Sequence, residues 1–295
     1  MQTPKNTSAD RVRILIVGAA GVGKTTILRK ICSETDTPIV HDAKGQEIYQ
    51  PASLEPTTER GLHDINHEIT YPSRPGFIFH DSRGLESGTV KELDEIREFL
   101  VRRARNEKDA VHVIWYCVSA NSCRPLVSAE RQFFERDRGK VPVIVIFTKL
   151  DGLVAKAFSD LKREGLVGAD AHRGAPARAD QLLQTHFIKP IMEMDHPPVG
   201  YVTFKGLHKP GGQCVELTRK TVKALEHHDQ NLQAMFVFAA KYDLESRLTA
   251  ALKWVWENGK GDTDEDTIKK ILIYFPHVWH TVSNLACSHF LEQGF

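Results

Sequence analysis

The sequence lacks a long apolar run, an excess of charge of either sign and any paired spacing of cysteines. No apolar stretch among its 295 residues approaches the roughly 18 residues that a membrane-spanning helix needs. Its 39 basic and 38 acidic residues give a net charge of +1, so no basic field predicts binding to nucleic acid or to an anionic membrane. We therefore expect no transmembrane segment and no nucleic-acid partner.

The cysteines form an odd, scattered set without a Cys-x-x-Cys motif: Cys32, Cys117, Cys123, Cys214 and Cys287. This arrangement predicts reduced thiols in a cytoplasmic protein and argues against a disulfide framework or a metal cluster. Residues 1–10 are polar and lack the apolar core of a signal peptide, so we expect a short disordered tail. Four histidines are assigned to structural or solvent contacts rather than to a metal: His63, His67, His227 and His228.

The first apolar run of the chain ends in a glycine-rich motif. Residues 12–17 have the length and composition of a buried strand, and Gly18-Ala-Ala-Gly-Val-Gly-Lys-Thr25 follows and leads into a helical pattern. A strand, a Gly-x-x-x-x-Gly-Lys-Thr loop and a helix in this order predict a phosphate-binding P-loop. Lys24 would bridge the β- and γ-phosphates, and the Thr25 hydroxyl would ligate Mg²⁺.

The loop amides and the positive end of the following helix form a nest that suits a polyphosphate. An ordinary glycine-rich turn is the alternative, but it leaves the agreement of strand, loop and helix unexplained. We expect the phosphates to contact eight residues: Gly18, Ala20, Gly21, Val22, Gly23, Lys24, Thr25 and Thr26.

A second apolar strand ends in Asp81-Ser-Arg-Gly84. At the end of a strand beside a P-loop, the Asp81 carboxylate can hold Mg²⁺, usually through a water. The Gly84 amide would bond the γ-phosphate only while that phosphate is present, which is how such loops sense hydrolysis. Asp-x-x-Gly alone also matches many ordinary turns, so its position after the strand carries the prediction.

A third strand, residues 141–147, leads directly into Thr148-Lys-Leu-Asp151. The Asp151 carboxylate can accept hydrogen bonds from both N1–H and the exocyclic amine of guanine, a donor pair that adenine does not offer. The aliphatic part of Lys149 would cover the base, and Thr148 would tie the loop to the P-loop. A solvated charged turn is the alternative. The order of the three motifs favours guanine.

With these motifs the chain resembles GTPases of the translation-factor (TRAFAC) class, in the AIG-type/Era/septin-like group, and in particular the small G-domain proteins of fungi. The resemblance covers roughly residues 11–228 and implies a P-loop GTPase G domain that binds GTP or GDP with Mg²⁺. It places the switch threonine, a further Mg²⁺ ligand, at Thr58, with Thr57 as the alternative. It also places a guanine-contacting loop near Gly206, although the Ser-Ala-Lys of the family is missing there.

Two departures from the family pattern bear on hydrolysis. Leu85 stands where Ras-like enzymes have a glutamine that positions the attacking water. Ala20 occupies a P-loop position that glycine often holds, where a methyl group crowds an arginine supplied in trans. We therefore expect slow intrinsic hydrolysis and name no catalytic residue. His80 and Arg83 flank the site, but a structural histidine and a surface ion pair are the better interpretations.

Alternating strands and helices predict a mainly parallel sheet with helices on both faces, and ligands at the carboxyl ends of the strands. Strands are expected at 12–17, 77–80, 111–118, 141–147 and 200–204, and helices at 24–32, 90–107, 127–137, 178–193 and 213–227. A sixth strand is expected over Leu62–Tyr71, with Ile65 and Ile69 on one face. Residues 167–177 are interpreted as a mobile loop between two helices. A helical extension, packed on the G domain or hinged to it, is expected over 229–295.

Three functions compete. The first is a GTPase switch that acts on an unknown effector protein. The second is an assembly or scaffold protein that forms homodimers through its nucleotide face when GTP binds, with little or no turnover; Leu85 favours it. The third is a P-loop kinase or ATPase, which leaves Thr148–Asp151 without a role.

Overall fold

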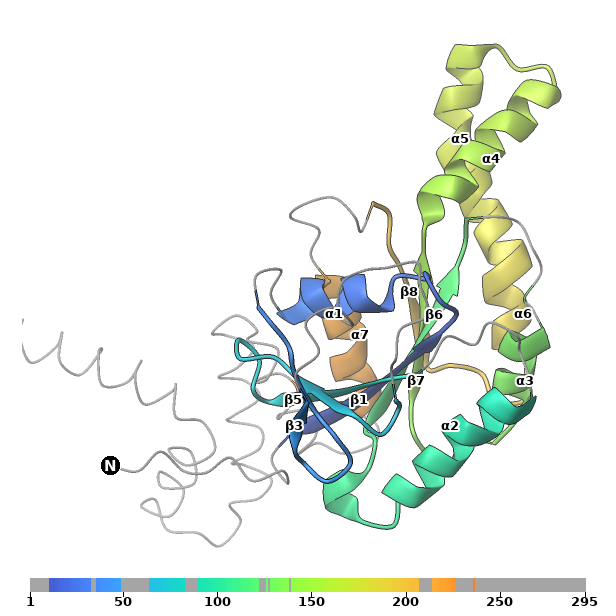
Figure 1. The fold of residues 1–295 in the computed structure, drawn as a ribbon. Helices are drawn as coiled ribbons and strands as arrows, with labels where there is room; N and C mark the ends of the chain where they lie inside the picture. The colour runs from blue at the N-terminus through green and yellow to red at the C-terminus, as the bar shows by residue number, and fades with distance from the viewer. Residues whose placement is uncertain are drawn as a thin grey trace, which may run out of the picture.

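An eight-stranded sheet organises the chain (Figure 1). The computed structural model describes residues 11–32, 36–48, 64–82, 90–121, 126, 128–137, 139–206, 214–226 and 236. Within these ranges the strands are β1 (Val12–Gly18), β2 (Ile39–His41), β3 (Glu47–Ile48), β4 (Glu68–Thr70), β5 (Phe77–Asp81), β6 (Val113–Ser119), β7 (Val143–Thr148) and β8 (Gly200–Thr203). Their order across the sheet is β3-β2-β4-β5-β1-β6-β7-β8.

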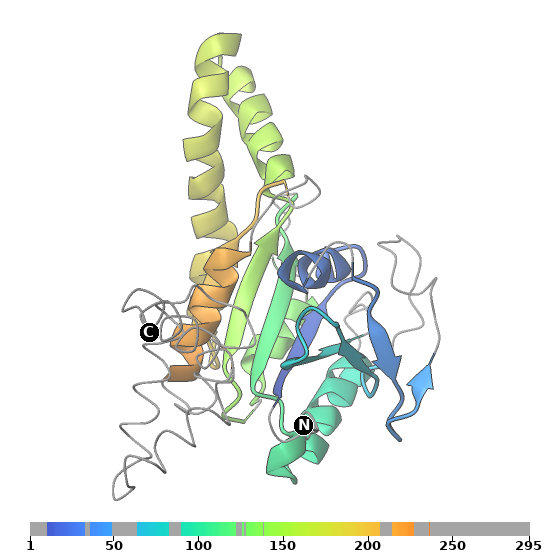
Figure 2. The same cartoon turned by 90° about the vertical axis from the view of Figure 1, so that its left-hand side faces the viewer.

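The five strands from β5 to β8 run parallel, and β2, β3 and β4 form an antiparallel edge. Among the described residues, helices α1 (Lys24–Cys32) and α7 (Val215–Glu226) cover one face. The other face carries α2 (Val90–Arg103), α3 (Ser128–Glu135), α4 (Leu150–Arg163), α5 (Gly168–Leu183) and α6 (Lys189–Met192), the last two joined by a π-helical turn, Gln184–Ile188. Figure 2 shows α1 and α7 together on their side of the sheet. The predicted mainly parallel α/β fold with helices on both faces is confirmed.

Alternation along β1 shows why the sheet is covered on both faces. Ile14 and Ile16 pack with α1 and α7, whereas Leu15 and Val17 pack with α2 and its neighbours. Every residue of β1 is buried, as expected for a parallel strand between two helical layers. On the α7 side, the Trp115 indole Nε1 donates a hydrogen bond to Thr221 Oγ1 at 3.1 Å, which fixes α7 against β6.

The predicted loop over 167–177 is wrong, because α5 begins at Gly168 and runs through this segment. Its glycine, alanine and proline content is typical of a loop, but Ala171, Ala175 and Ala179 recur every four residues and are all buried. Ala175 and Ala179 belong to the same core cluster as Leu153 and Ala157 of α4, and small buried side chains let the two helices approach closely. The α4–α5 hairpin that results projects away from the sheet (Figure 1).

The predicted strand over Leu62–Tyr71 is much shorter in the structure. Among residues 64–71, the described part of this segment, only Glu68–Thr70 pair with neighbouring strands. Asp64 starts a turn in which its Oδ1 accepts a hydrogen bond from the Asn66 amide at 2.9 Å. Ile65 and Ile69 do not share a face. Ile65 packs with the α2 layer, and Ile69 with the α1 layer.

The short strands β2 and β3 were not predicted, since three and two residues are too few for a recognisable periodicity. Asp42 Oδ1 closes the turn between them by accepting hydrogen bonds from the Lys44 and Gln46 amides, each at 2.8 Å. The predicted helix 90–107 ends at Arg103, and Asn106 caps a separate 3₁₀ turn, Glu107–Asp109. The other predicted strands and the helices 24–32, 127–137 and 213–227 agree with the structure to within about two residues.

A buried arginine at the start of β1 links this strand to β4 and to the 3₁₀ turn before β6. These contacts lie at the end of β1 that is opposite the P-loop. The Arg13 side chain, only 1% exposed, donates to Glu68 Oε1 at 2.6 Å and to Asp109 Oδ1 at 3.2 Å. Arg103 also pairs with Glu68, at 3.2 Å. Burial raises the pKa of Glu68, but the Arg13 guanidinium outweighs burial, and the pKa lies below its usual range.

Several expectations lie outside the described residues. They concern the tail 1–10, His63, His227 and His228, and nearly all of the predicted extension 229–295. Phe236 is the one described residue of that extension: it is 1% exposed, and its ring centroid lies 5.1 Å from that of Phe77. Within the described ranges, no helix is long and apolar enough to cross a bilayer.

Candidate functional site

The P-loop connects β1 to α1, where the sequence places the phosphate-binding motif. Three of its glycines have positive φ: +148° at Gly18, +66° at Gly21 and +103° at Gly23. These values turn the loop into a concave path that L side chains rarely adopt. The first turn of α1 carries no acidic side chain, so the positive end of this helix remains available to an anion.

Gly18 is required by packing as well as by conformation. It lies opposite Cys117 of β6, and a Cβ on Gly18 would stand 2.5 Å from the Cys117 carbonyl oxygen. Any side chain here would therefore push the loop off the sheet. Burial raises the pKa of the Cys117 thiol, although nearby Lys24 opposes this effect, so the thiol stays protonated and unreactive.

The Lys24 side chain folds back over the P-loop, which ends at this residue. Its Nζ donates hydrogen bonds to the carbonyl oxygens of Gly18 at 2.9 Å and Ala19 at 3.2 Å, and the residue is 8% exposed. The charge is thus buried with two oxygen partners and already stands at the mouth of the loop. Ala20 and Gly21, by contrast, are accessible at the loop surface.

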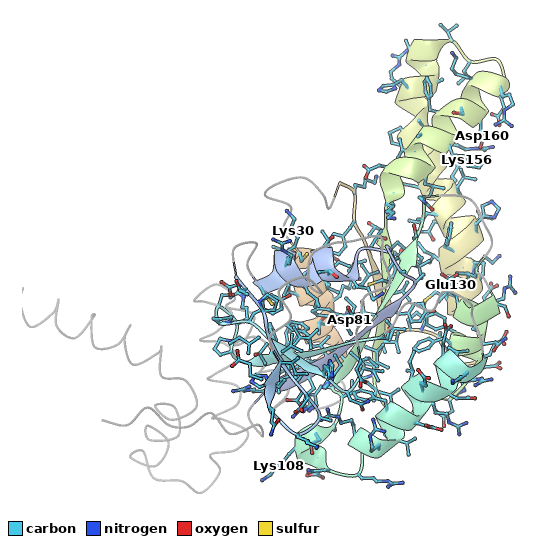
Figure 3. All side chains as sticks on the ribbon, viewed as in Figure 1. Lys30, Asp81, Lys108, Glu130, Lys156 and Asp160 are labelled. Carbon is cyan, nitrogen blue, oxygen red and sulfur yellow. The ribbon has the colours of Figure 1, made fainter. Side chains whose placement is uncertain are left out.

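Asp81 ends β5 directly beside the P-loop strand, in register with Ile16 of β1. It is 3% exposed, and the next amide, Ser82 N–H, donates to the Ile16 carbonyl at 3.0 Å. Figure 3 shows Asp81 in the middle of the molecule, while Lys156 and Asp160 lie on the projecting hairpin. With the hydroxyl of Thr25 in the first turn of α1, Asp81 offers the oxygen ligands that Mg²⁺ prefers, so the residue types fit this ion.

The remaining residues predicted to contact Mg²⁺ or the γ-phosphate, Thr58 (or Thr57) and Gly84, lie outside the described residues, as do Arg83 and Leu85. His80 is described, and it belongs to the α2 layer. Its ring packs on Phe99 at 5.0 Å between centroids, and Nδ1 lies 3.0 Å from the Ile65 carbonyl, to which it must donate. Burial lowers the pKa of His80 to about 3. The structural interpretation of this histidine is therefore supported.

The predicted base-reading loop is joined to the P-loop by a side chain. Thr148, 1% exposed at the end of β7, donates through Oγ1 to the Val22 carbonyl at 2.7 Å. The sequence predicted that Thr148 would tie these loops together, and the geometry agrees. Lys149 follows with φ +57°, which reverses the chain and lets α4 begin at Leu150.

Asp151 stands in the first turn of α4 and is solvent-exposed. One carboxylate oxygen, Oδ2, accepts a hydrogen bond from the Gly206 amide at 2.9 Å across 55 residues of sequence. Gly206 itself has φ +62°. The chain therefore brings together the two loops from which base contacts were predicted, and the loop after β8 orients the carboxylate.

One residue that supports this arrangement was missed from the sequence. Gly152 follows Asp151 in α4, and a Cβ here would stand 2.8 Å from the Asn121 carbonyl oxygen. The start of α4 is thus pressed against the chain that leaves β6. A glycine in the first turn of a helix, where it costs helix propensity, was the available signal.

We call the assembly of Gly18–Thr26, Asp81, Thr148–Asp151 and Gly206 the loop edge of the sheet. These residues lie at the carboxyl ends of the parallel strands, in the loops that leave them, or in the first turns of α1 and α4. This is where open α/β sheets bind ligands. The loop edge combines a positively polarised loop, a lysine, a buried carboxylate and an exposed carboxylate.

No protein-family model matches the chain, and no curated protein matches its sequence. Among solved structures, the septin GTPase domain from Chlamydomonas reinhardtii is similar at 14% identity, with a TM-score of 0.35 and coverage of 66% of each chain. The G domain of the T. maritima FeoB iron transporter is similar at 15% identity and a TM-score of 0.34, over 72% of this chain and 98% of that one. The chain thus spans just under two thirds of the septin domain.

Proposed function

We propose that this protein binds GTP with Mg²⁺ and hydrolyses it slowly to GDP, as a molecular switch for an effector protein. The observation that carries the proposal is the joining of the two loops at the loop edge. Thr148 holds the base-reading loop to Val22 of the P-loop at 2.7 Å. This contact supports the proposal that the P-loop nest and the Asp151 carboxylate serve one nucleotide site.

In this proposal each residue has a defined task. Lys24 exchanges its two carbonyl partners for the β- and γ-phosphates, and the amides of Gly21–Thr26 donate to the phosphate oxygens. Thr25 and Asp81, with Thr58, hold the ion, whose charge neutralises the phosphates. Asp151, oriented by Gly206, accepts from the guanine edge, and Lys149 covers the base.

A second function, nucleotide-gated assembly with little turnover, is favoured by Leu85. This residue has no polar group with which to orient an attacking water, and it follows the Gly84 that would sense the γ-phosphate. In that case GTP binding, not hydrolysis, would drive homodimer formation through the loop edge.

Two wider features accompany the proposal. The buried free thiols of Cys32, Cys117 and Cys214 suit the cytoplasm, where thiols remain reduced. The G domain is proposed to span 11–228, and the burial of Phe236 against Phe77 supports packing of the start of the 229–295 extension on that domain.

The test is binding of GTP and ATP, together with phosphate release over many turnovers at several protein concentrations. GTP-selective turnover at a constant specific rate supports the switch. A specific rate that rises with concentration indicates a site completed across a dimer, and GTP-selective binding without turnover, with a GTP-dependent mass by light scattering, supports assembly. A preference for ATP would remove the guanine role of Asp151 and with it both proposals.

A further inference from the structure

A cavity of about 300 Å³ lies between α2 and the turn that precedes β4, outside the loop edge. The side chains that bear charge or a hydroxyl in its lining are Asp64, Ser82, Glu92, Glu95, Glu98 and Arg102. Ser82 directly follows Asp81, so the cavity adjoins the strand end that carries the proposed Mg²⁺ ligand. The proposed nucleotide site makes no use of it.

Two shielded oxygen atoms of the lining have no hydrogen-bond partner among the described residues. Ser82 is 3% exposed, and its Oγ is unpaired. Oε2 of the half-buried Glu92 is likewise out of contact with solvent and unpaired. A buried polar atom without a hydrogen-bond partner is unfavourable, and more so when the group is charged. Both atoms would gain from a donor placed in the cavity.

The charges of the lining side chains also favour a ligand that donates hydrogen bonds. Four carboxylates, those of Asp64, Glu92, Glu95 and Glu98, stand against the single guanidinium of Arg102. That guanidinium already donates to the Asn66 side-chain oxygen. The cavity therefore has an excess of negative charge and of acceptors over donors.

The kind of cation follows from the geometry. In the described part of the chain, no three carboxylate, histidine or cysteine side chains are grouped so that they could hold a metal ion. An organic cation with several N–H groups can instead reach scattered acceptors, and a guanidinium carries five in a planar fork. The volume is at the lower limit for small-molecule sites, which suits one long side chain better than a cofactor.

We propose that this cavity binds a guanidinium or ammonium group, supplied by an arginine or lysine side chain of a partner protein or by a small free amine. The cation donates to Ser82 Oγ and to the Glu92 carboxylate, and Glu95 and Glu98 supply further negative charge. The proposal does not depend on nucleotide binding. The proposed cation site lies between α2 and the end of β5, and Ser82, which lines it, directly follows Asp81.

The test is an NMR titration of the full-length ¹⁵N-labelled protein with Nα-acetyl-arginine methylamide. Nα-acetyl-norleucine methylamide, a neutral probe with an aliphatic side chain, is the matched control. We expect saturable amide shifts at Ser82, Glu95 and Asn66 with the arginine probe, with a dissociation constant of about 1 mM, and none with the control probe. Absence of saturable shifts, or equal shifts with the two probes, overturns the proposal.

The double variant Glu92→Gln/Glu95→Gln should weaken binding of the arginine probe about tenfold, since it removes two charges while keeping the shape of the lining. Glu135→Gln, an exposed change on α3, should leave it unchanged. Equal weakening by both variants would show general charge attraction and would overturn the site. GTP affinity, measured on the same variants, separates this outcome from failure of the proposed nucleotide site.

The source of the cation is decided by agmatine, a free amine that carries the same guanidinium. Tighter binding of the capped arginine indicates that the peptide backbone contributes, and assigns the cavity to a partner protein. Equal or tighter binding of agmatine assigns it to a small free amine. Both results support the site, whereas binding of neither probe refutes it.

Discussion

The loop edge and the α4–α5 hairpin meet at Asp151 but are specified in different ways. At the loop edge, backbone geometry restricts the residue: Gly18 has no room for a Cβ beside Cys117, and Thr148 must reach Val22. In the hairpin, side-chain size is the restriction, because the methyl groups of Ala175 and Ala179 are buried in the same core cluster as Leu153 and Ala157 of α4. The backbone restriction at the loop edge is visible in the sequence as a motif of specific residues. The size restriction in the hairpin is visible only as alanines spaced four residues apart.

The largest expected effect is at Lys24. Lys24→Ala should weaken GTP binding about 100-fold or more, because two charge-assisted contacts to phosphates are lost. Lys30→Ala, on the same helix but six residues further on, should retain the affinity. Binding of a fluorescent GTP analogue measures both. A GTP affinity of Lys24→Ala within about threefold of the wild-type value would refute the P-loop assignment.

Asp151→Asn tests the base-reading end of the loop edge. The amide presents a donor where the carboxylate accepted, so GTP affinity should fall about 100-fold and xanthosine triphosphate should bind better than GTP. Asp180→Asn, an exposed change on α5, serves as the control. Competition between the two nucleotides gives the preference, and an unchanged preference for GTP would exclude Asp151 from the site.

The hairpin should respond to size alone. Ala175 is 1% exposed, so Ala175→Leu should lower the free energy of unfolding by about 2 kcal/mol through overpacking. Ala177→Leu, two residues on and exposed, should be nearly neutral. Urea unfolding compares the two. Similar losses in both variants would contradict the packing described between α4 and α5.

Thr148→Val keeps the shape of a loop-edge residue and removes one hydrogen bond. The Val22 carbonyl loses its partner, so the free energy of unfolding should fall by about 1 kcal/mol and GTP affinity about fivefold. Thr203→Val, exposed on β8, should change neither. If Thr148→Val alters stability but leaves GTP affinity intact, the loop junction has no part in nucleotide binding.

The smallest effect concerns Glu68, remote from both regions. Its pKa is lower in the folded protein than in the unfolded chain, so its contribution is present above the unfolded pKa and is lost as the pH falls through the folded pKa. Glu68→Gln should cost about 1 kcal/mol of the free energy of unfolding at pH 7, and this difference should shrink in acid. Exposed Glu107→Gln is the control. A difference independent of pH would exclude the ion pairs as its cause.

The fold class and the loop edge were predictable because each rests on local rules. Gly18–Thr25 combine a strand end, positive φ and a helix start within eight residues, and Thr148–Asp151 follow a buried strand directly. The contact from Asp151 to Gly206 spans 55 residues of sequence. The sequence therefore predicted that a loop near Gly206 contacts the base, but it did not predict the hydrogen bond to Asp151. Gly152 was overlooked because its neighbour, Asn121, lies in the segment after β6, about 30 residues earlier in the sequence.

The errors also have physical reasons. Helix α5 is rich in glycine, alanine and proline, residues that read as a loop until a partner helix buries its alanines. Ile65 and Ile69 have the spacing of one strand face, but the Asp64 side chain captures the Asn66 amide and turns the chain between them. In both cases a contact that local patterns do not encode decided the structure.

The attachment of the hairpin has a mechanical consequence. Helix α4 begins one residue before Asp151 and extends fourteen residues, about 21 Å at the usual rise. With α5 packed along it as a brace, a tilt of about 10° at the base moves the far end by roughly 4 Å. Small rotations of the base-reading loop would therefore appear as larger displacements at the far end of the hairpin. A fluorophore at Val167, read against one on the sheet, would report those rotations as a change in distance.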